Sequence, residues 1–424
     1  MTGFEDALIA VAFAFLLNAF ILFRITRSFP WDESRFLGKV YVATLLLRYA
    51  LAVFLNVYSE DSSFALTFWG DSSTYDLGAR LLASGWSGDV VLAPRVERQV
   101  SGYGFYYFVA FFYYVFGRNP LLVQFVNGTI GALTVVVIYS IARTLFDKDV
   151  ARWAARLMAF FPQIIFWSAA LYKDPVIMFC IALCMYGLLG LRERFSLRHL
   201  LLFVAAGLAI LTLRFYVFYF VAFATLGTFV FAQRRGVIAS LVTQVGLVAV
   251  FLAAFSVVAR EETLQQHSEF FRLERVQVSR EDLARSALSG FAPETDVSTT
   301  EGALAVLPIG FLYLMFSPFP WAVQGIRQAL TVPETLVWYA LMPALVRGIV
   351  FTVRHRFRAT LPIFAFAISL TLAYSVFQGN VGTAYRQRTQ ITMFIFIFMG
   401  VGIVEKRRQR ARLRAASVAQ PLHA

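Results

Sequence analysis

Long apolar runs recur along this chain from Ala7 to Val404, and they constrain its fold more than any other feature. Each run is close to the roughly 20 residues that a helix needs to cross the hydrocarbon core of a bilayer. Hydrophobic residues make up 59% of the chain and charged residues only 15%, which is too few for the surface of a soluble domain of this length. Lipid admits only helices and closed barrels, and barrel strands would be short and alternating. The sequence therefore predicts an all-α, polytopic integral membrane protein.

Eleven membrane spans are clear, and two shorter apolar stretches bring the predicted total to about 11–13 transmembrane helices. The spans lie near residues 7–26, 38–57, 120–143, 151–170, 175–191, 198–213, 215–232, 236–258, 331–352, 359–377 and 389–404. Glu5 and Asp6 precede the first run, where a cleavable signal peptide would carry basic residues. We therefore expect the first run to be retained as a span.

Basic clusters set the predicted orientation, because Lys and Arg collect in cytoplasmic loops and the chain has a net charge of +13. The clusters lie near residues 24–39, 143–152, 192–198, 234–235, 354–358 and 406–414. They are predicted to face the cytoplasm together with the C-terminus, whereas residues 58–119, 260–302 and 378–388 face the other side. The basic tail is expected to contact anionic headgroups. Nucleic-acid binding is not expected, since no soluble domain is predicted that could host it.

These assignments divide the chain into six parts. They are two N-terminal spans (1–57), a first external loop with interfacial helices (58–119), a central bundle (120–258), a second long external loop (259–302), a C-terminal bundle (303–404) and a basic cytoplasmic tail (405–424). Tyr103–Phe116 has 14 residues, many of them aromatic, and is predicted to lie in the interface, which favours such rings. Gly302–Pro320 contains three prolines, and both a re-entrant and a broken helix stay open for it.

A candidate catalytic carboxylate follows Trp69 and Gly70 in the first external loop. Glycine permits a tight turn, so Asp71 is expected to project near the membrane surface. Leu77–Ala83 is predicted to be a short helix with Asp76 as its cap. Two interpretations of Asp71 stay open, a residue of a capped turn and a general base at the interface.

A second candidate carboxylate, Asp174, lies in a tight external turn between two apolar runs. Pro175 is favoured at the start of a helix, so Asp174 is either a helix cap or a second acidic group facing the same external chamber as Asp71. The cysteines Cys180 and Cys184 are predicted to be small core residues. The four histidines are scattered, and no metal ligands are predicted.

Arginines on the predicted external face indicate a ligand that contains phosphate. Arg386 and Arg388 precede the last span, against the usual charge bias, and arginine binds phosphate oxygens bidentately. Phosphate at this level indicates a lipid-linked group, with ordinary headgroup anchoring as the alternative. Arg214 lies between two spans and is either a snorkelling residue or a second phosphate contact. Arg48 lies within a span, where a charge needs a partner that the sequence does not identify.

Five segments in this order resemble the GT-C class of membrane glycosyltransferases, and in particular bacterial relatives of dolichyl-phosphate-mannose protein mannosyltransferases such as the lipid A aminoarabinose transferase. The segments are GDSSTYDLGARLLASGW (70–86), the aromatic stretch 103–117, LVQFVNGTIGALTVVVIYSIARTLF (122–146), ARWAARLMAFFPQIIFWSAALYKDP (151–175) and GTAYRQR (382–388). The resemblance implies a GT-C-like fold, a polyprenyl-phosphate sugar donor and no required metal. Asp71 matches the general base, and Asp174 matches the acidic residue of the second external turn.

This chain departs from the family in having an extra N-terminal span, and it has Ser101-Gly102-Tyr103 where a basic residue and prolines are frequent. The predicted function is nonetheless that of an inverting hexosyl- or pentosyltransferase of the cell envelope. It acts on the non-cytoplasmic side of a multi-pass membrane protein, in the bacterial inner or plasma membrane. Asp71 is the predicted base, and Asp174 orients the acceptor or holds Lys173.

The predicted substrate-binding residues are Tyr75, Lys173, Arg214, Tyr385, Arg386 and Arg388. The expected partners are a lipid-linked sugar donor, an acceptor glycan, lipid or protein, and membrane lipids. No cofactor is predicted, although a divalent metal stays open. The alternatives are a ligase or polymerase of lipid-linked glycans that uses a polyprenyl diphosphate, and a transporter or flippase.

Overall fold

The computed structural model describes residues 3–58, 70–88, 103–230, 269–285, 289–292, 294–323 and 325–419. Within these ranges the chain is helical and has no strand, which confirms the all-α prediction. The helices are α1 (Gly3–Ser28), α2 (Trp31–Val57), α4 (Asp71–Trp86), α5 (Tyr103–Phe116), α6 (Pro120–Leu145), α7 (Lys148–Phe160), α8 (Pro162–Ala169), α9 (Asp174–Glu193), α10 (Leu197–Val230), α13 (Leu273–Arg285), α14 (Thr300–Phe316), α15 (Ile326–Phe377), α16 (Val381–Gln387) and α17 (Thr389–Ala419).

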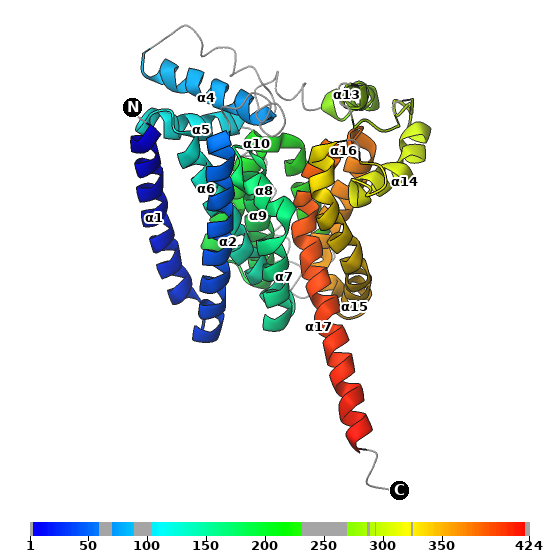
Figure 1. Ribbon diagram of the computed structural model, residues 1–424. Coiled ribbons are helices and arrows are strands. Elements are labelled where there is room, and N and C mark those ends of the chain that lie inside the picture. The colour runs from blue at the N-terminus through cyan, green and yellow to red at the C-terminus, as the bar shows by residue number, and fades with distance from the viewer. Residues whose placement is uncertain are drawn as a thin grey trace.

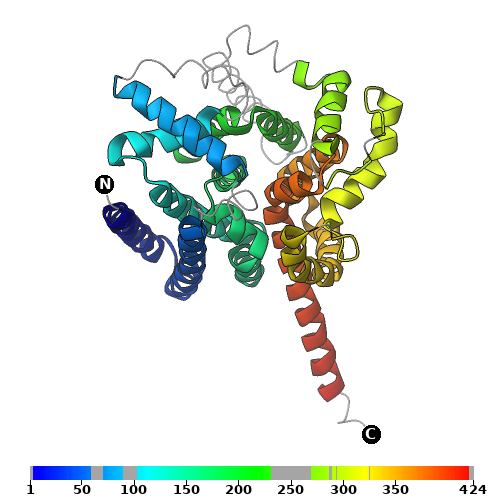
Figure 2. The same cartoon turned by 45° about the horizontal axis from the view of Figure 1, so that its top comes forward.

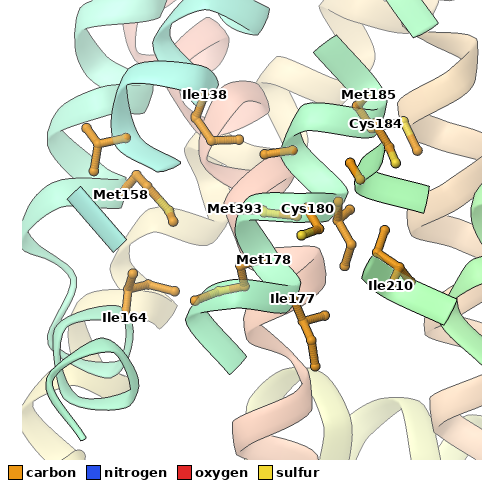
Figure 3. Packing of buried hydrophobic residues seen from close by; sticks show 14 of the residues in the cluster. Ile138, Met158, Ile164, Ile177, Met178, Cys180, Cys184, Met185, Ile210 and Met393 are labelled. Atoms are coloured by element: carbon orange, nitrogen blue, oxygen red, sulfur yellow. The ribbon is translucent and has the colours of Figure 1, made fainter. Parts of the chain in front are cut away.

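Long helices run side by side in one bundle together with the shorter α7 and α8, and other short helices gather at one end of the bundle (Figure 1). The start of α1 and the helices α4, α5, α13 and α16 lie at this end, and the end of α17 lies far beyond the other. Figure 2 turns the end with the short helices toward the viewer. Apolar side chains make up most of the core, and Cys180 and Cys184 are buried in it among Met178 and Met185, as predicted (Figure 3).

Seven helices of the described residues are long and apolar enough to cross a membrane. Two of these, α10 and α15, contain a residue with non-helical backbone, Arg214 in α10 and Arg356 in α15. Each of these two helices therefore holds two of the predicted spans. The predicted span 236–258 lies outside the described residues.

Both broken helices fold back on themselves. In α15, a Cβ added to Gly348 would lie 1.8 Å from the carbonyl oxygen of Phe398, and the Phe364 ring stacks 4.7 Å from the Phe398 ring. In a straight helix, these two α15 residues would be about 24 Å apart. In α10, a Cβ added to Gly207 would lie 3.7 Å from the Phe218 ring, which a straight helix would also prevent.

The predicted span 151–170 is two helices rather than one. Phe161 has an extended backbone, and Pro162 begins α8 after it, because proline starts a helix well but cannot continue one. The interrupted turn leaves the Ala159 carbonyl in need of donors. Thr44 donates to it at 2.7 Å and Arg48 at 3.2 Å, and Arg48 also donates to Ser168 at 2.8 Å. Arg48 thus stabilises a broken helix inside the bundle.

The segments predicted to face the cytoplasm meet at the end of the bundle opposite the short helices. Arg143 at the end of α6 pairs with Glu33 of α2 at 2.5 Å, and Arg408 of α17 pairs with Asp147 before α7 at 2.7 Å. Arg192 of α9 donates to the Ala359 carbonyl just after the break in α15. The basic clusters within the described residues therefore share one end of the bundle, whereas the predicted cluster at residues 234–235 lies outside the described residues.

The first external loop differs from its prediction in one respect. Helix α4 begins at Asp71, six residues before the predicted helix, because Gly70 has a φ of +40° and turns the chain there. Asp76 consequently lies inside the helix and is not a cap. It accepts hydrogen bonds from Tyr113 at 2.6 Å and from Arg118 at 2.7 Å, which join α4 to the end of α5.

The two short apolar stretches are both helices. Helix α5 spans Tyr103–Phe116, the predicted interfacial segment, and packs against α4 and α10. Helix α14 spans Thr300–Phe316 and packs against α15, with Pro308 inside it. The predicted last span continues as α17 to Ala419, so the described part of the basic tail is helical.

Candidate active site

Arg386 of α16 binds both predicted catalytic carboxylates. Its Nη1 lies 2.5 Å from Asp71 Oδ2, and its Nε lies 2.6 Å from Asp174 Oδ2. The three residues come from the start of α4, the start of α9 and the end of α16. Segments that are distant in the sequence thus meet in one charged cluster, which we call the Arg386 cluster and to which Lys173 and Arg214 also belong.

Asp71 is the accessible carboxylate of the cluster. It is the first residue of α4, and its side chain is 57% exposed. A Cβ added to Gly70 would lie 3.0 Å from the Tyr172 hydroxyl, so glycine serves both the positive φ and the close approach of the turn to Tyr172. The start of α4 is therefore held directly over the turn that carries Asp174.

Asp174 is fully buried, and the side chain of Asn127 fixes the turn that carries it. Asn127 of α6 donates to the carbonyls of Ala170 at 3.0 Å and of Tyr172 at 2.9 Å. Asp174 does not cap α9 with its side chain, which excludes the first of the two interpretations. Instead its carboxylate binds Arg386, and its Oδ1 lies 3.6 Å from Arg214 Nη2.

Arg214 enters the cluster because the break in α10 falls on it. Its backbone has φ −160° and ψ 79°, and its side chain is buried. In the structure, Arg214 Nη1 and Asp174 Oδ1 are buried without a hydrogen-bond partner among the described residues. Buried polar atoms are seldom left in this state, so the cluster has hydrogen-bonding capacity for a polar ligand.

Lys173 and Tyr75 form the edge of the cluster. Lys173 Nζ lies 5.9 Å from the centre of the Tyr75 ring. Burial, reinforced by the neighbouring Arg214, lowers the pKa of Lys173 from 10.5 to about 7. Burial also raises the pKa of the Tyr75 hydroxyl, and the Tyr75 ring packs 4.9 Å from Phe105 of α5. Lys173 therefore changes its charge near neutral pH.

Aromatic rings enclose the guanidinium of Arg386, whose Cζ lies 4.5 Å from the centre of the Tyr172 ring and 5.5 Å from that of Trp167. Burial alone would lower the pKa of Arg386, but Asp174 and Asp71 outweigh it and raise that pKa above its ordinary value. Arg386 is thus a permanent cation with a fixed orientation.

Arg388 and Tyr385 lie apart from the cluster. Arg388 is buried and donates to the carbonyls of Met315 at 2.8 Å and Ser317 at 3.1 Å, at the end of α14. Its Cζ lies 5.2 Å from the Trp338 ring, and the Tyr385 carbonyl accepts a hydrogen bond from Gln163 of α8. These contacts hold α16 in place, and the role of Tyr385 and Arg388 in substrate binding stays a prediction.

Sequence reasoning missed Asn127, Trp167 and Tyr172 as parts of the site. Asn127 carried a signal, because a polar side chain inside an apolar span usually has a specific partner. The two aromatic residues carried none, because the chain contains many others. Among the described residues, no three His, Cys, Asp or Glu side chains form a group that could hold a metal ion.

Comparison with known proteins finds a family model that matches part of the chain. Residues 101–259 match the model of a family described as dolichyl-phosphate-mannose-protein mannosyltransferase. The match contains Lys173, Asp174 and Arg214, whereas Asp71 and Arg386 lie outside it. The chain matches no curated protein significantly.

Two solved structures of oligosaccharyltransferase from Archaeoglobus fulgidus are similar to this structure. The crystal structure of the apo form has 14% sequence identity and a TM-score of 0.52, and the similarity covers 92% of this chain and 52% of that chain. The structure of the oligosaccharyltransferase AglB in complex with an inhibitory peptide and a dolichol-phosphate has 13% identity, a TM-score of 0.52 and coverages of 93% and 53%. This chain has the GT-C glycosyltransferase fold.

The predicted resemblance to GT-C enzymes is therefore confirmed. The chain spans about half the length of the oligosaccharyltransferase structures that it matches. Within this GT-C fold, the Arg386 cluster lies where α4, α9, α10 and α16 meet, at the end of the bundle with the short helices (Figure 1).

Proposed function

We propose that this protein transfers a sugar from a polyprenyl-phosphate donor to an acceptor hydroxyl on the non-cytoplasmic face of the membrane. The observation that carries the proposal is the double ion pair of Arg386 with Asp71 and Asp174. It combines an accessible carboxylate with a fixed, buried cation. The family match to dolichyl-phosphate-mannose-protein mannosyltransferases and the dolichol-phosphate bound to the similar AglB structure support a lipid-phosphate donor.

In the proposed reaction, the Asp71 carboxylate accepts the proton of the acceptor hydroxyl. The hydroxyl oxygen then attacks the anomeric carbon from the face opposite the phosphate. The bond from that carbon to the phosphate oxygen breaks, and its electron pair stays on the polyprenyl phosphate. A single displacement of this kind inverts the anomeric centre. Asp71 is suited to this step because it is exposed, whereas the buried Asp174 is suited to orient Arg386.

The cations of the cluster are proposed to bind the donor phosphate. Lys173, Arg214 and Arg386 carry three positive charges against the two of Asp71 and Asp174, which leaves a net charge of +1 when Lys173 is protonated. A phosphodiester linked to a sugar carries one negative charge and balances the cluster. A diphosphate carries two, so the charge balance favours the monophosphate donor. A bound phosphate also favours the charged form of Lys173.

Charge balance is kept as the reaction proceeds. The leaving phosphate gains one negative charge, while Asp71 loses one on taking the proton. Preorganised cations at a developing charge lower the barrier without needing to rearrange. We place Tyr75 and Lys173 at the edge that meets the sugar or the acceptor. No cofactor is part of the proposal, and the acceptor is a glycan, a lipid or a protein.

The proposed location is the inner or plasma membrane of a bacterium. The end that gathers Arg143, Arg192 and Arg408 would face the cytoplasm, because cytoplasmic loops are enriched in Lys and Arg. The C-terminus would lie on that side. The Arg386 cluster, at the opposite end, would then face away from the cytoplasm (Figure 1).

The test is transfer of a radiolabelled sugar from a panel of polyprenyl-monophosphate and polyprenyl-diphosphate sugars in membranes that contain the protein. Wild type is expected to transfer from a monophosphate donor, and Asp71→Asn to lose this activity at an unchanged protein level. Glu274→Gln is the matched control, because Glu274 is an exposed carboxylate of α13 that pairs only with Arg272 among the described residues. Transfer by Asp71→Asn at the wild-type rate would exclude Asp71 as the base.

Transfer from diphosphate donors alone would replace the proposal with ligation or polymerisation of lipid-linked glycans. No transfer from either donor class would favour a transporter. A parallel reaction with a chelator tests for a metal, and retention of activity there is expected.

A further inference from the structure

Asp71 and Asp174 hold Arg386 in unequal ways. The Asp174 side chain is 0% exposed, and Arg214 and the Asn127-fixed turn keep it in place. The Asp71 side chain is 57% exposed and stands at the first residue of α4. Water solvates the free Asp71 carboxylate well, so breaking its pair with Arg386 costs less free energy than breaking the pair with the buried Asp174. Asp71 is therefore the replaceable partner of Arg386.

The two carboxylates also bind different nitrogen atoms of Arg386. Asp174 binds Arg386 through Nε, whereas Asp71 binds through Nη1 at the end of the guanidinium. The Arg386 side chain is 14% exposed, so a ligand must reach it from the Asp71 side. A phosphate bound bidentately to the end of an arginine uses its terminal nitrogens. Its oxygen would need the place that Asp71 Oδ2 occupies on Nη1.

We propose that the lipid phosphate and the Asp71 carboxylate compete for Arg386, so that donor binding releases Asp71 to act as the base. This inference rests on the proposed function and adds an order of events to it. In the free protein, Arg386 holds Asp71 Oδ2 and keeps the carboxylate away from an acceptor. Once the phosphate takes Nη1, the exposed Asp71 side chain turns toward the acceptor, while Asp174 continues to hold Nε. The donor therefore binds before a productive acceptor complex forms.

Competition for Arg386 predicts a change in phosphate affinity that a purely catalytic role of Asp71 does not predict. Removing the negative charge of Asp71 abolishes transfer but strengthens phosphate binding, because Arg386 no longer has to exchange partners. Giving up an ion pair with an exposed carboxylate costs up to about 1 kcal/mol, so the expected gain in affinity is about two- to fivefold.

The experiment measures the affinity of polyprenyl phosphate, without any sugar, for the full-length protein in phosphatidylcholine nanodiscs. Asp71→Asn is expected to bind it about two- to fivefold more tightly than wild type, and Arg386→Gln at least about tenfold more weakly. Glu274→Gln removes a similar exposed charge from α13 and is expected to bind like wild type. Its behaviour separates competition at Arg386 from a general change in surface charge.

Equal or weaker binding by Asp71→Asn overturns the inference, as does an equal gain in Glu274→Gln. The same gain with phosphatidic acid in place of polyprenyl phosphate would overturn the donor as the competing ligand and assign the site to membrane lipids. The transfer assay distinguishes the two proposals. Loss of transfer in Asp71→Asn with unchanged affinity contradicts only the competition. Tighter binding without transfer by wild type contradicts only the glycosyltransferase function.

Discussion

Asp174 Oδ2 lies 2.6 Å from Arg386 Nε, and this contact joins residues that are 212 positions apart in the chain. It links the start of α9 in the centre of the bundle to α16 at the start of the last helix. Because Asp174 is fully buried, its charge depends on Arg386 and Arg214 for compensation. The site and the packing of the C-terminal helices are therefore linked through one carboxylate.

The two carboxylates are expected to differ in their effect on stability. Asp174→Ala leaves Arg214 and Arg386 buried without their partner, and breaking such a pair costs about 3–5 kcal/mol. Asp71→Ala removes an exposed partner and is expected to cost less than about 1 kcal/mol. Thermal unfolding of the purified protein in detergent measures both. Equal losses of melting temperature would contradict the assignment of Asp174 as the fixed partner.

Substitutions of Arg386 and Arg388 are expected to lower different quantities, the transfer rate for Arg386 and the melting temperature for Arg388. Arg386→Lys cannot bridge Asp71 and Asp174 with one planar group, and the transfer rate is expected to fall about 100-fold with little loss of protein. Arg388→Lys loses its paired contact with the Met315 and Ser317 carbonyls, so the melting temperature is expected to fall. The KM for the donor is expected to stay unchanged in the folded fraction of Arg388→Lys. A raised KM would instead give Arg388 a direct role in binding.

Lys173 is expected to produce a pH-dependent difference in stability. Its pKa is about 7 in the folded protein against 10.5 ordinarily, so between these values the unfolded chain binds more protons. The free energy of unfolding therefore rises with pH across this window, and the cost of burying the charged lysine is complete only below pH 7.

Lys173→Met removes this cost, so the variant should melt above wild type at pH 6, and this advantage should shrink as the pH rises to 9. The charged groups that face Lys173 are Arg214, Asp174, Arg386 and Asp71. If the difference in melting temperature between Lys173→Met and wild type does not change with pH, the pKa of Lys173 lies outside this pH range.

Close packing of α15 against α17 is expected to exclude a side chain at Gly348. A Cβ there would lie 1.8 Å from the Phe398 carbonyl oxygen, so Gly348→Ala must push the helices apart and is expected to cost about 1–3 kcal/mol. Gly38 of α2 is the matched control, since nothing lies within 4 Å of its added Cβ. Gly38→Ala is expected to stabilise its helix by about 0.5–1 kcal/mol. Thermal unfolding compares the two, and a gain at both positions would show that helix propensity outweighs packing at Gly348.

Hydropathy and charge predicted most of the fold, because each span must satisfy its backbone internally and each basic loop must stay in water. The length and aromatic content of Tyr103–Phe116 predict a separate short helix, which the structure contains as α5. The break at Phe161 was not predicted, although Pro162 was visible, because the apolar run continues through it.

The candidate site was predicted less completely. Asp71, Asp174 and Arg386 were identified, but the pairing among them depends on how α16 is rotated. Residues two positions apart on a helix point in nearly opposite directions, about 200° apart, so sequence spacing could not show which of Arg386 and Arg388 faces the carboxylates. Asn127 binds carbonyls 43 and 45 positions away, and backbone acceptors leave no trace in the sequence.

Helix α17 begins directly after Arg388 and continues without a break to Ala419. Beyond Arg408, which still pairs with Asp147, its last 11 residues extend about 16 Å, clear of the other helices (Figure 1). A rigid protein fused in helical register to this extension would inherit the orientation of the bundle. Such a fusion would give a small, nearly featureless membrane protein an external marker for particle alignment in electron microscopy, at the end of the molecule farthest from the Arg386 cluster.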